Sequence, residues 1–492
     1  ALPIDTMNTE YLVTDYNPAF FGSQFTVYAA FDNTTVTITP TTDLVGRAAG
    51  VPFDVVLDRG EGYYGRGVST LITNTLTGTE IVSDLPVGLV NGNGCTQVPL
   101  GTTACDHIFE VAQPVQSWGM SALVGGLPNR TDGSIYRIVA SEDATTVLQD
   151  NVAIGVINRG EFIETPILPG DHLFSADNPI YVIQFMTGLN ASGAVLGDPA
   201  MGNMTPAEQY LSDYTFSTVG GSQFVENYVT IVAEDADVAT LTLDGSVVGA
   251  GLFSPIGVSG FSVARLLLSS GTHTTSSLGV HGITVEGYNS FDSYIYPGGA
   301  LFQFINPVGD ANAPICEGLV MAGAPPSFTG SGEDSRPSED VNDNGVLDPG
   351  EDLNGNGNID VDTGVFFVEL MAGASNLSLL VDPFIPGDDL VNYSVELIDP
   401  NASGTGTVIV TDGAGNICEQ PVDLIVDAVP LVCDVDVDGD VDRVDVGLIF
   451  AARNQPATGP NDPRDSDGDG VITVLDGRLC VQECTLASCA VE

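Results

Sequence analysis

Short segments of this chain place oxygen-bearing side chains at alternate positions around a glycine, and this spacing constrains the fold more than any other feature. Two such twelve-residue segments run in tandem through 340–363, and two more lie at 434–445 and 465–476. A calcium ion takes about six to eight oxygen ligands, which a twelve-residue loop supplies from positions 1, 3, 5, 7, 9 and 12, with glycine at position 6. Clustered carboxylates repel one another until a cation neutralises them, so the pattern predicts folding that depends on calcium.

The predicted ligands follow from these loop positions. In the first loop they are Asp340, Asn342, Asn344, the carbonyl of Val346, Asp348 and Glu351. In the second they are Asp352, Asn354, Asn356, the carbonyl of Asn358, and Asp360, with Thr363 in place of the last acid. In the third they are Asp434, Asp436, Asp438, the carbonyl of Asp440, Asp442 and Asp445. In the fourth they are Asp465, Asp467, Asp469, the carbonyl of Val471, Thr473 and Asp476. We therefore expect Ca²⁺ as a structural cofactor.

The charge balance excludes several classes of protein. The formal net charge is −53, from 65 acidic residues against 12 basic ones, and every basic residue is an arginine. Nucleic acid binding requires basic groups that neutralise phosphates, so we exclude nucleic acid as a partner, and anionic membranes are disfavoured for the same reason. The absence of lysine removes Schiff-base and isopeptide chemistry. A hydrophobic content of 43% indicates a folded chain rather than a disordered one.

The eight cysteines predict disulfide bonds in an oxidising compartment, because no CxxC pair or zinc-ligand spacing is present. We expect the pairs Cys95–Cys105 and Cys316–Cys418, whereas Cys433, Cys480, Cys484 and Cys489 allow three pairings. No apolar run is long enough to span a bilayer. We interpret Ala1 as the start of a mature chain whose signal peptide has been removed, which predicts an extracellular or cell-surface location.

Before residue 440 the hydrophobic pattern is typical of strands. Short runs rich in Val, Ile, Thr and Tyr, such as 24–30, 35–39, 135–140 and 181–185, are separated by Gly, Asn, Asp and Pro. The segments 26–39, 137–150 and 230–244 form a weak repeat, each with a strand, an acidic turn and a Thr/Val-rich strand. We predict a mainly β protein of tandem antiparallel β-sandwich modules, with a small helical domain at the C-terminus. The three β modules are expected at 1–117, 118–216 and 217–312.

Residues 95–147 carry a group of motifs that a known family shares. They are Cys105-Asp106-His107, Pro114 to Gly119, Arg130, Tyr136 to Ala140, and Thr145 to Val147. With these motifs, the region of about 10–305 resembles the N-terminal part of the IgG Fc-binding protein family. The resemblance implies a β-rich extracellular region, 1–312 in all, and carries over no binding residues.

Two further resemblances concern the rest of the chain. The segment 404–426 is similar to the closing hairpin of bacterial immunoglobulin-like domains, which implies a β-sandwich at 313–429 with the tandem loops inserted. Residues 433–484 resemble a type I dockerin, with a helix expected after each loop at 446–453 and 477–483, inside a domain at 430–492. In that family loop positions 10 and 11 contact a cohesin partner, and here these are Arg443, Val444, Val474 and Leu475.

Motifs for catalysis are missing. The GEGYYG segment at 60–65 has strand-like flanks and is interpreted as a glycine-rich turn. The histidines at 107, 172, 273 and 281 have no carboxylate partner nearby in the sequence, and His107 is expected to form structural hydrogen bonds. Trp118 is expected in the core rather than at a sugar site. We therefore expect no enzyme activity.

The sequence as a whole predicts a secreted calcium-binding structural or adhesive protein, which self-associates as a subunit of a surface appendage, filament, layer or matrix. A homo-oligomer or polymer is expected, with another surface protein as a further partner, and residues 1–16 are a candidate donor strand. The alternative is a dockerin-type module that binds a cohesin-like scaffold. A third, weaker interpretation is a polysaccharide-active or carbohydrate-binding protein.

Overall fold

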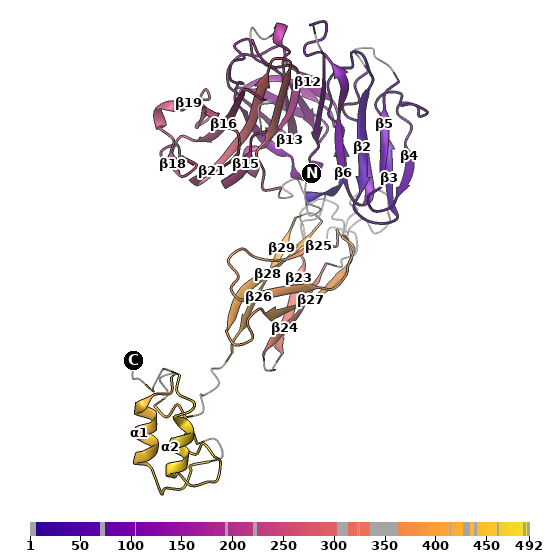
Figure 1. Ribbon diagram of the computed structural model, residues 1–492. Helices are drawn as coiled ribbons and strands as arrows, with labels where there is room; N and C mark the ends of the chain where they lie inside the picture. The colour runs from indigo at the N-terminus through magenta and orange to yellow at the C-terminus, as the bar shows by residue number, and fades with distance from the viewer. Residues whose placement is uncertain are drawn as a thin grey trace.

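The prediction of a mainly β protein is confirmed by the computed structural model (Figure 1). The structure describes residues 6–68, 74–103, 105–191, 195–219, 224–302, 313–321, 323, 325–334, 363–413, 415–426, 433–436, 440–459, 462–485 and 489. Within these ranges the strands form five antiparallel sheets, and two α-helices follow them near the C-terminus.

Three large sheets succeed one another along the first 300 residues, and they share one plan. The first contains β1 (Asn8–Leu12), β2 (Ser23–Ala29), β3 (Thr34–Thr39), β4 (Phe53–Leu57), β5 (Gly62–Arg66), β6 (Glu80–Thr96) and β7 (Asp106–Val111). The second contains β8 (Gly119–Val124), β9 (Ser134–Ala140), β10 (Thr145–Gln149), β11 (Val152–Ile157), β12 (Phe162–Glu164), β13 (His172–Met186) and β14 (Ala200–Met204). The third contains β15 (Leu211–Ser217), β16 (Glu226–Glu234), β17 (Thr242–Leu243), β18 (Ser246–Val247), β19 (Ser254–Pro255), β20 (Phe261–Leu268), β21 (Thr272–Asn289) and β22 (Asp292–Pro297).

Each of these sheets is organised around one long strand. The long strands are β6 with 17 residues, β13 with 15 and β21 with 18. In each case the first half pairs with the first and third strands of its sheet, and the second half pairs with the second and the last strand. The weak sequence repeat is therefore a structural repeat.

The repeat extends to the acidic turns. A threonine hydroxyl closes each turn by donating to a carbonyl three residues earlier, at Thr34, Thr145 and Thr240. In the first two turns the preceding residue, Asn33 or Ala144, has a φ near +60°, which fixes a tight reversal. These local contacts explain why the same short pattern recurs in all three sheets.

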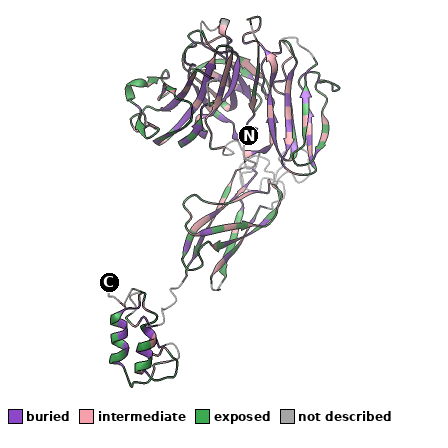
Figure 2. Ribbon diagram, viewed as in Figure 1, coloured by how far each residue is buried: buried purple, intermediate pink, exposed green. Residues whose placement is uncertain are grey.

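The second sheet packs between the other two, and its strand β9 is therefore buried on both faces. All seven residues of β9 are buried, whereas β2 alternates between buried and half-buried residues (Figure 2). β14 lies beside both β7 and β22, so the last strands of the three sheets meet. Trp118 is fully buried and stacks on Tyr181 with ring centroids 4.9 Å apart, as expected for a core residue.

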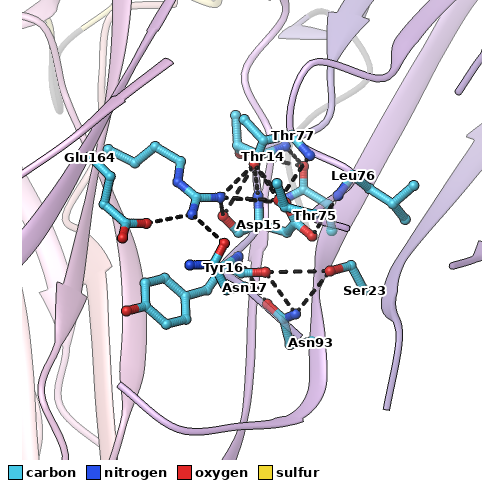
Figure 3. Close-up of polar contacts among 12 residues, drawn as sticks. Thr14, Asp15, Tyr16, Asn17, Ser23, Thr75, Leu76, Thr77, Asn93 and Glu164 are labelled. Carbon is cyan, nitrogen blue, oxygen red and sulfur yellow. Dashed lines mark hydrogen bonds and ion pairs between the residues drawn. The ribbon is translucent and has the colours of Figure 1, made fainter. Parts of the chain in front are cut away.

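A buried arginine joins the first two sheets. The Arg137 side chain is fully buried and donates to the Asp15 carbonyl at 2.6 Å, the Thr77 hydroxyl at 2.8 Å and Glu164 at 2.5 Å. Asp15, Thr75 and Thr77 lie in segments that connect strands of the first sheet, Glu164 ends β12 of the second sheet, and Figure 3 shows their polar groups converging. A buried charge is tolerated when it is paired and hydrogen-bonded, and both terminal nitrogens of Arg137 donate hydrogen bonds, although its Nε has no partner.

The described residues between 315 and 424 form a two-layer sandwich. One sheet has the order β23 (Ile315–Met321), β24 (Ser327–Glu333), β27 (Leu390–Leu397), β26 (Leu377–Val381), and the other has the order β25 (Val365–Leu370), β28 (Gly404–Asp412), β29 (Ile417–Leu424). The Cys316–Cys418 disulfide joins the first strand to the last. Figure 1 shows this sandwich below the three large sheets.

Some sequence expectations are wrong. β1 pairs with β6 of its own sheet, so Asn8–Leu12 is an internal strand rather than a free donor segment. The segment at 60–65 is a turn only at its start, because β5 begins at Gly62. The side chain of His107 is exposed and its ring stacks on Phe109, in place of the expected structural hydrogen bonds.

Candidate metal centre

The third predicted loop brings carboxylates together at the start of helix α1 (Arg443–Ala451). One carboxylate oxygen each of Asp434, Asp436 and Asp445 lie within 4.8 Å of one another, and the same holds for Asp440, Asp442 and Asp445. Asp445 is fully buried and accepts hydrogen bonds from the amides of Val435 at 2.7 Å and Asp442 at 2.8 Å. The loop is therefore folded around its last carboxylate.

The fourth predicted loop has the same geometry at the start of helix α2 (Val474–Cys480). Carboxylate oxygens of Asp465, Asp467 and Asp476 lie within 4.8 Å of one another. The buried Asp476 accepts from the amides of Thr473 at 2.7 Å and Asp467 at 3.2 Å. Gly470, at loop position 6, has a φ of +86°, a conformation that strongly favours glycine.

Both helices begin three residues earlier than the sequence predicted. Asp442 and Thr473 are the N-caps, and each forms a capping box with the acid three residues later, Asp445 or Asp476. The last acid of each loop therefore has two tasks, because it caps a helix and faces the other loop carboxylates.

The carboxylates of the fourth loop influence one another. The Asp469 amide hydrogen bond lowers the pKa of Asp467, but desolvation and the charges of Asp476, Asp469 and Asp465 outweigh it, so this pKa is raised. Burial raises the pKa of Asp476, but backbone hydrogen bonds from Thr473 and Asp467 leave it lowered. This crowding of negative charge is the condition that a divalent cation relieves.

The two loops form one unit. The Asn454 amide donates to the Ile472 carbonyl at 2.7 Å, and the Ile472 amide donates to the Gln455 carbonyl at 2.9 Å. The Cys433–Cys480 disulfide ties the start of the third loop to the end of α2. The core between the helices contains Val446, Ile449 and Ile472.

The donor set fits a hard divalent cation, because it consists of carboxylate, hydroxyl and backbone oxygens without nitrogen or thiolate ligands. In the third loop Asp434, Asp436, Asp440, Asp442 and Asp445 would hold the ion, and in the fourth Asp465, Asp467, Asp469, Thr473 and Asp476, with the carbonyl of Val471. The predicted ligands at 340–360 and Asp438 lie outside the described residues.

Sequence reasoning missed two histidine–carboxylate pairs. His172 Nδ1 lies 2.8 Å from Asp150 Oδ2, and His273 Nδ1 lies 2.7 Å from Asp244 Oδ2. Burial lowers the pKa of His273, but the hydrogen bonds to Asp244 and the Ser269 carbonyl outweigh it and raise this pKa. The pairs occupy equivalent places in the second and third sheets, because each histidine lies at the start of the long strand, β13 or β21. The two histidine–aspartate pairs stabilise turns. Neither pair brings a nucleophile together with a base.

All eight cysteines are paired. The bonds are Cys95–Cys105, Cys316–Cys418, Cys433–Cys480 and Cys484–Cys489. The first two are the pairs expected from the sequence, and the last two select one of the three open alternatives.

The larger part of the chain is similar to a known protein family. The family model described as IgGFc binding protein matches residues 1–287. The human IgGFc-binding protein is 26% identical over 253 residues, which cover 50% of this chain but only 4% of that protein. In the described residues no helix is long and apolar enough to cross a membrane. The matched residues include all three large sheets except the end of the third, and the chain belongs to the IgGFc-binding protein family.

Proposed function

We propose that this chain is a secreted calcium-binding structural or adhesive protein, which self-associates within a surface appendage, filament, layer or matrix. The proposal of calcium binding rests on the repeated geometry of the C-terminal loops. In each loop a buried carboxylate in the first turn of the helix, Asp445 or Asp476, lies close to two other carboxylates. The family is one of secreted proteins and is not known for enzyme activity, which supports an extracellular, non-catalytic role.

The sandwich supports the same proposal. Its four- and three-stranded sheets have the strand order of seven-stranded immunoglobulin-type domains, with the insertion between the second and third strands. Such domains serve as spacers and binding modules on cell surfaces. The disulfides fit an oxidising exterior.

Sedimentation velocity of the full chain in millimolar calcium, repeated after chelation, tests the proposal. We expect species larger than the 51.0 kDa monomer in calcium, and the chelated sample shows whether the association depends on the ion. A monomer in both conditions would remove self-association from the proposal.

Exposed apolar side chains on the surface of α1 and α2 favour a second candidate function. The large apolar side chains of Val444, Leu448, Val474, Leu475 and Val481 are all exposed, and Figure 2 shows exposed residues along the outer sides of both helices. For so small a unit this is much unburied apolar area, which is typical of a docking surface. A dockerin-type module that binds a cohesin-like scaffold would use this surface.

A pull-down with cohesins tests this alternative. If it holds, Val474→Asp with Leu475→Asp abolishes capture, because two charges then face a desolvated contact. Leu319→Asp, at a position on the sandwich that is 60% exposed, is the matched control and leaves capture unchanged. Failure of the unmodified chain to capture any cohesin rules the alternative out.

A further inference from the structure

The sandwich has four edge strands, and three of them are protected against pairing with another strand. β29 contains Pro421 and the charged residues Glu419 and Asp423. β25 is interrupted by a register shift between Val365 and Phe367, a bulge that twists the edge. β23 has Glu317 in its centre and is bonded to β29 through Cys316–Cys418. Prolines, charges and bulges are the means by which natural sheets prevent edge-to-edge association.

The fourth edge, β26, has none of these protections. Its sequence is Leu-Ser-Leu-Leu-Val, without charge or proline, and it pairs with β27 in unbroken register. In the part of the chain that the structure describes, β27 is the only strand that pairs with β26. The outward backbone groups of β26 are therefore available to a further strand.

The side chains of β26 divide by face. Leu377, Leu379 and Val381 lie opposite Leu397, Val395 and Tyr393 of β27, and all six belong to the core cluster of the sandwich or pack against it. Ser378 and Leu380 face outward, and Leu380 is 65% exposed. A strand added at this edge would extend the core layer and cover Leu379 and Val381, which are only half-buried.

We propose that β26 is a homotypic interface, in which two copies of the chain pair antiparallel across this edge to form one eight-stranded sheet. The inference rests on the proposed self-association and names its surface. A twofold axis through Leu379 places Leu377 opposite Val381 and Ser378 opposite Leu380 of the second copy, so that equivalent faces stay aligned.

Charge favours a second copy in this register. With a net charge of −53, two copies associate only where carboxylates do not meet. The register sets Asp382, which follows β26, opposite the uncharged Asn376 of the other copy, whose side chain is hydrogen-bonded within its own chain, so no carboxylate lies directly opposite Asp382. The segment from Leu377 to Val381 contributes no charge.

The test uses sedimentation velocity of the full chain in millimolar calcium over a range of concentrations. Ser378→Asp with Leu380→Asp puts two acids directly opposite two acids across the axis, and we expect association to be lost. Ser378→Arg with Leu380→Asp puts an arginine opposite an aspartate at both places, and we expect association to return. Leu319→Asp, on the other edge of the same sheet and 60% exposed in the unmodified chain, is the matched control and leaves association unchanged.

A cysteine reports the register independently. All native cysteines are bonded, so Leu379→Cys introduces a single free thiol that faces its own copy at the axis. Directly opposite Cβ atoms lie about 4.5–5.5 Å apart, close enough for diamide to oxidise the two thiols to a disulfide. We expect a covalent dimer from Leu379→Cys and little from Leu319→Cys.

The outcomes separate this inference from the function on which it rests. If the unmodified chain associates but the two-acid variant associates equally and Leu379→Cys gives no dimer, the β26 interface is wrong while self-association stands. If the unmodified chain stays monomeric, both fail, and an extended peptide from a foreign protein becomes the candidate occupant of the edge.

Discussion

Replacing Arg137 by methionine is expected to lower the free energy of unfolding of the three-sheet region by about 3–5 kcal/mol, which is typical for removal of one partner of a buried ion pair. Asp15 is fully buried and would lose the guanidinium that lies 3.8 Å from it. The hydrogen bonds to Thr75, Thr77 and Asn17 would be lost as well. Urea unfolding of the full chain measures the effect.

Arg66→Met is the matched control for this prediction. Arg66 lies on β5 and is exposed, so its replacement is expected to change stability by less than about 0.5 kcal/mol. Equal effects of the two substitutions would show that the Arg137 network contributes nothing specific to the packing of the first sheet on the second.

Chelation of calcium is expected to unfold the helix pair while leaving the β sheets intact. An ion that binds only the folded state stabilises it by about 2.7 kcal/mol when its free concentration is 100-fold above the dissociation constant. Two loops would therefore lose about twice that amount. Amide hydrogen exchange followed by mass spectrometry resolves the effect, with fast exchange expected in α1 and α2 and unchanged exchange in β9.

Single substitutions sharpen this prediction. Asp445→Asn and Asp476→Asn each remove a carboxylate that both caps a helix and faces the other loop acids, and we expect fast exchange of the helices even in calcium. Asp389→Asn, at an exposed position of the sandwich, is the control. Slow exchange of α1 and α2 after chelation would contradict a structural role for the ion.

Strands could be predicted from the sequence where the strand pattern is contained in one short run of residues. Runs at 24–30, 35–39 and 135–140 correspond to β2, β3 and β9, because side chains in a strand alternate and Val, Ile and Thr favour it. The helix starts were not predicted, because Asp442 and Thr473 were interpreted only as loop ligands. Their capping role depends on the acid three residues later, which also has a place in the loop pattern.

Contacts between distant segments were not predictable. Arg137 lies in an apolar strand, and its partner Asp15 is 122 residues away in the segment that follows β1. His172 and Asp150 are 22 residues apart, and His273 and Asp244 are 29 apart, so no short motif marks them. The register of the long strands brings these residues together, and register follows from the packing of whole sheets.

The bond between Cys316 and Cys418 has a mechanical consequence. A tensile load applied between the large sheets and the helix pair passes through this covalent link. The 102 residues of sequence between the two cysteines therefore carry none of the load. If the sandwich melted under load, those residues would add nothing to the end-to-end length, although fully extended they would span roughly 350 Å. An oxidised chain under tension therefore behaves as a nearly inextensible tether at this point, and reduction of one bond turns the same segment into a long, compliant one.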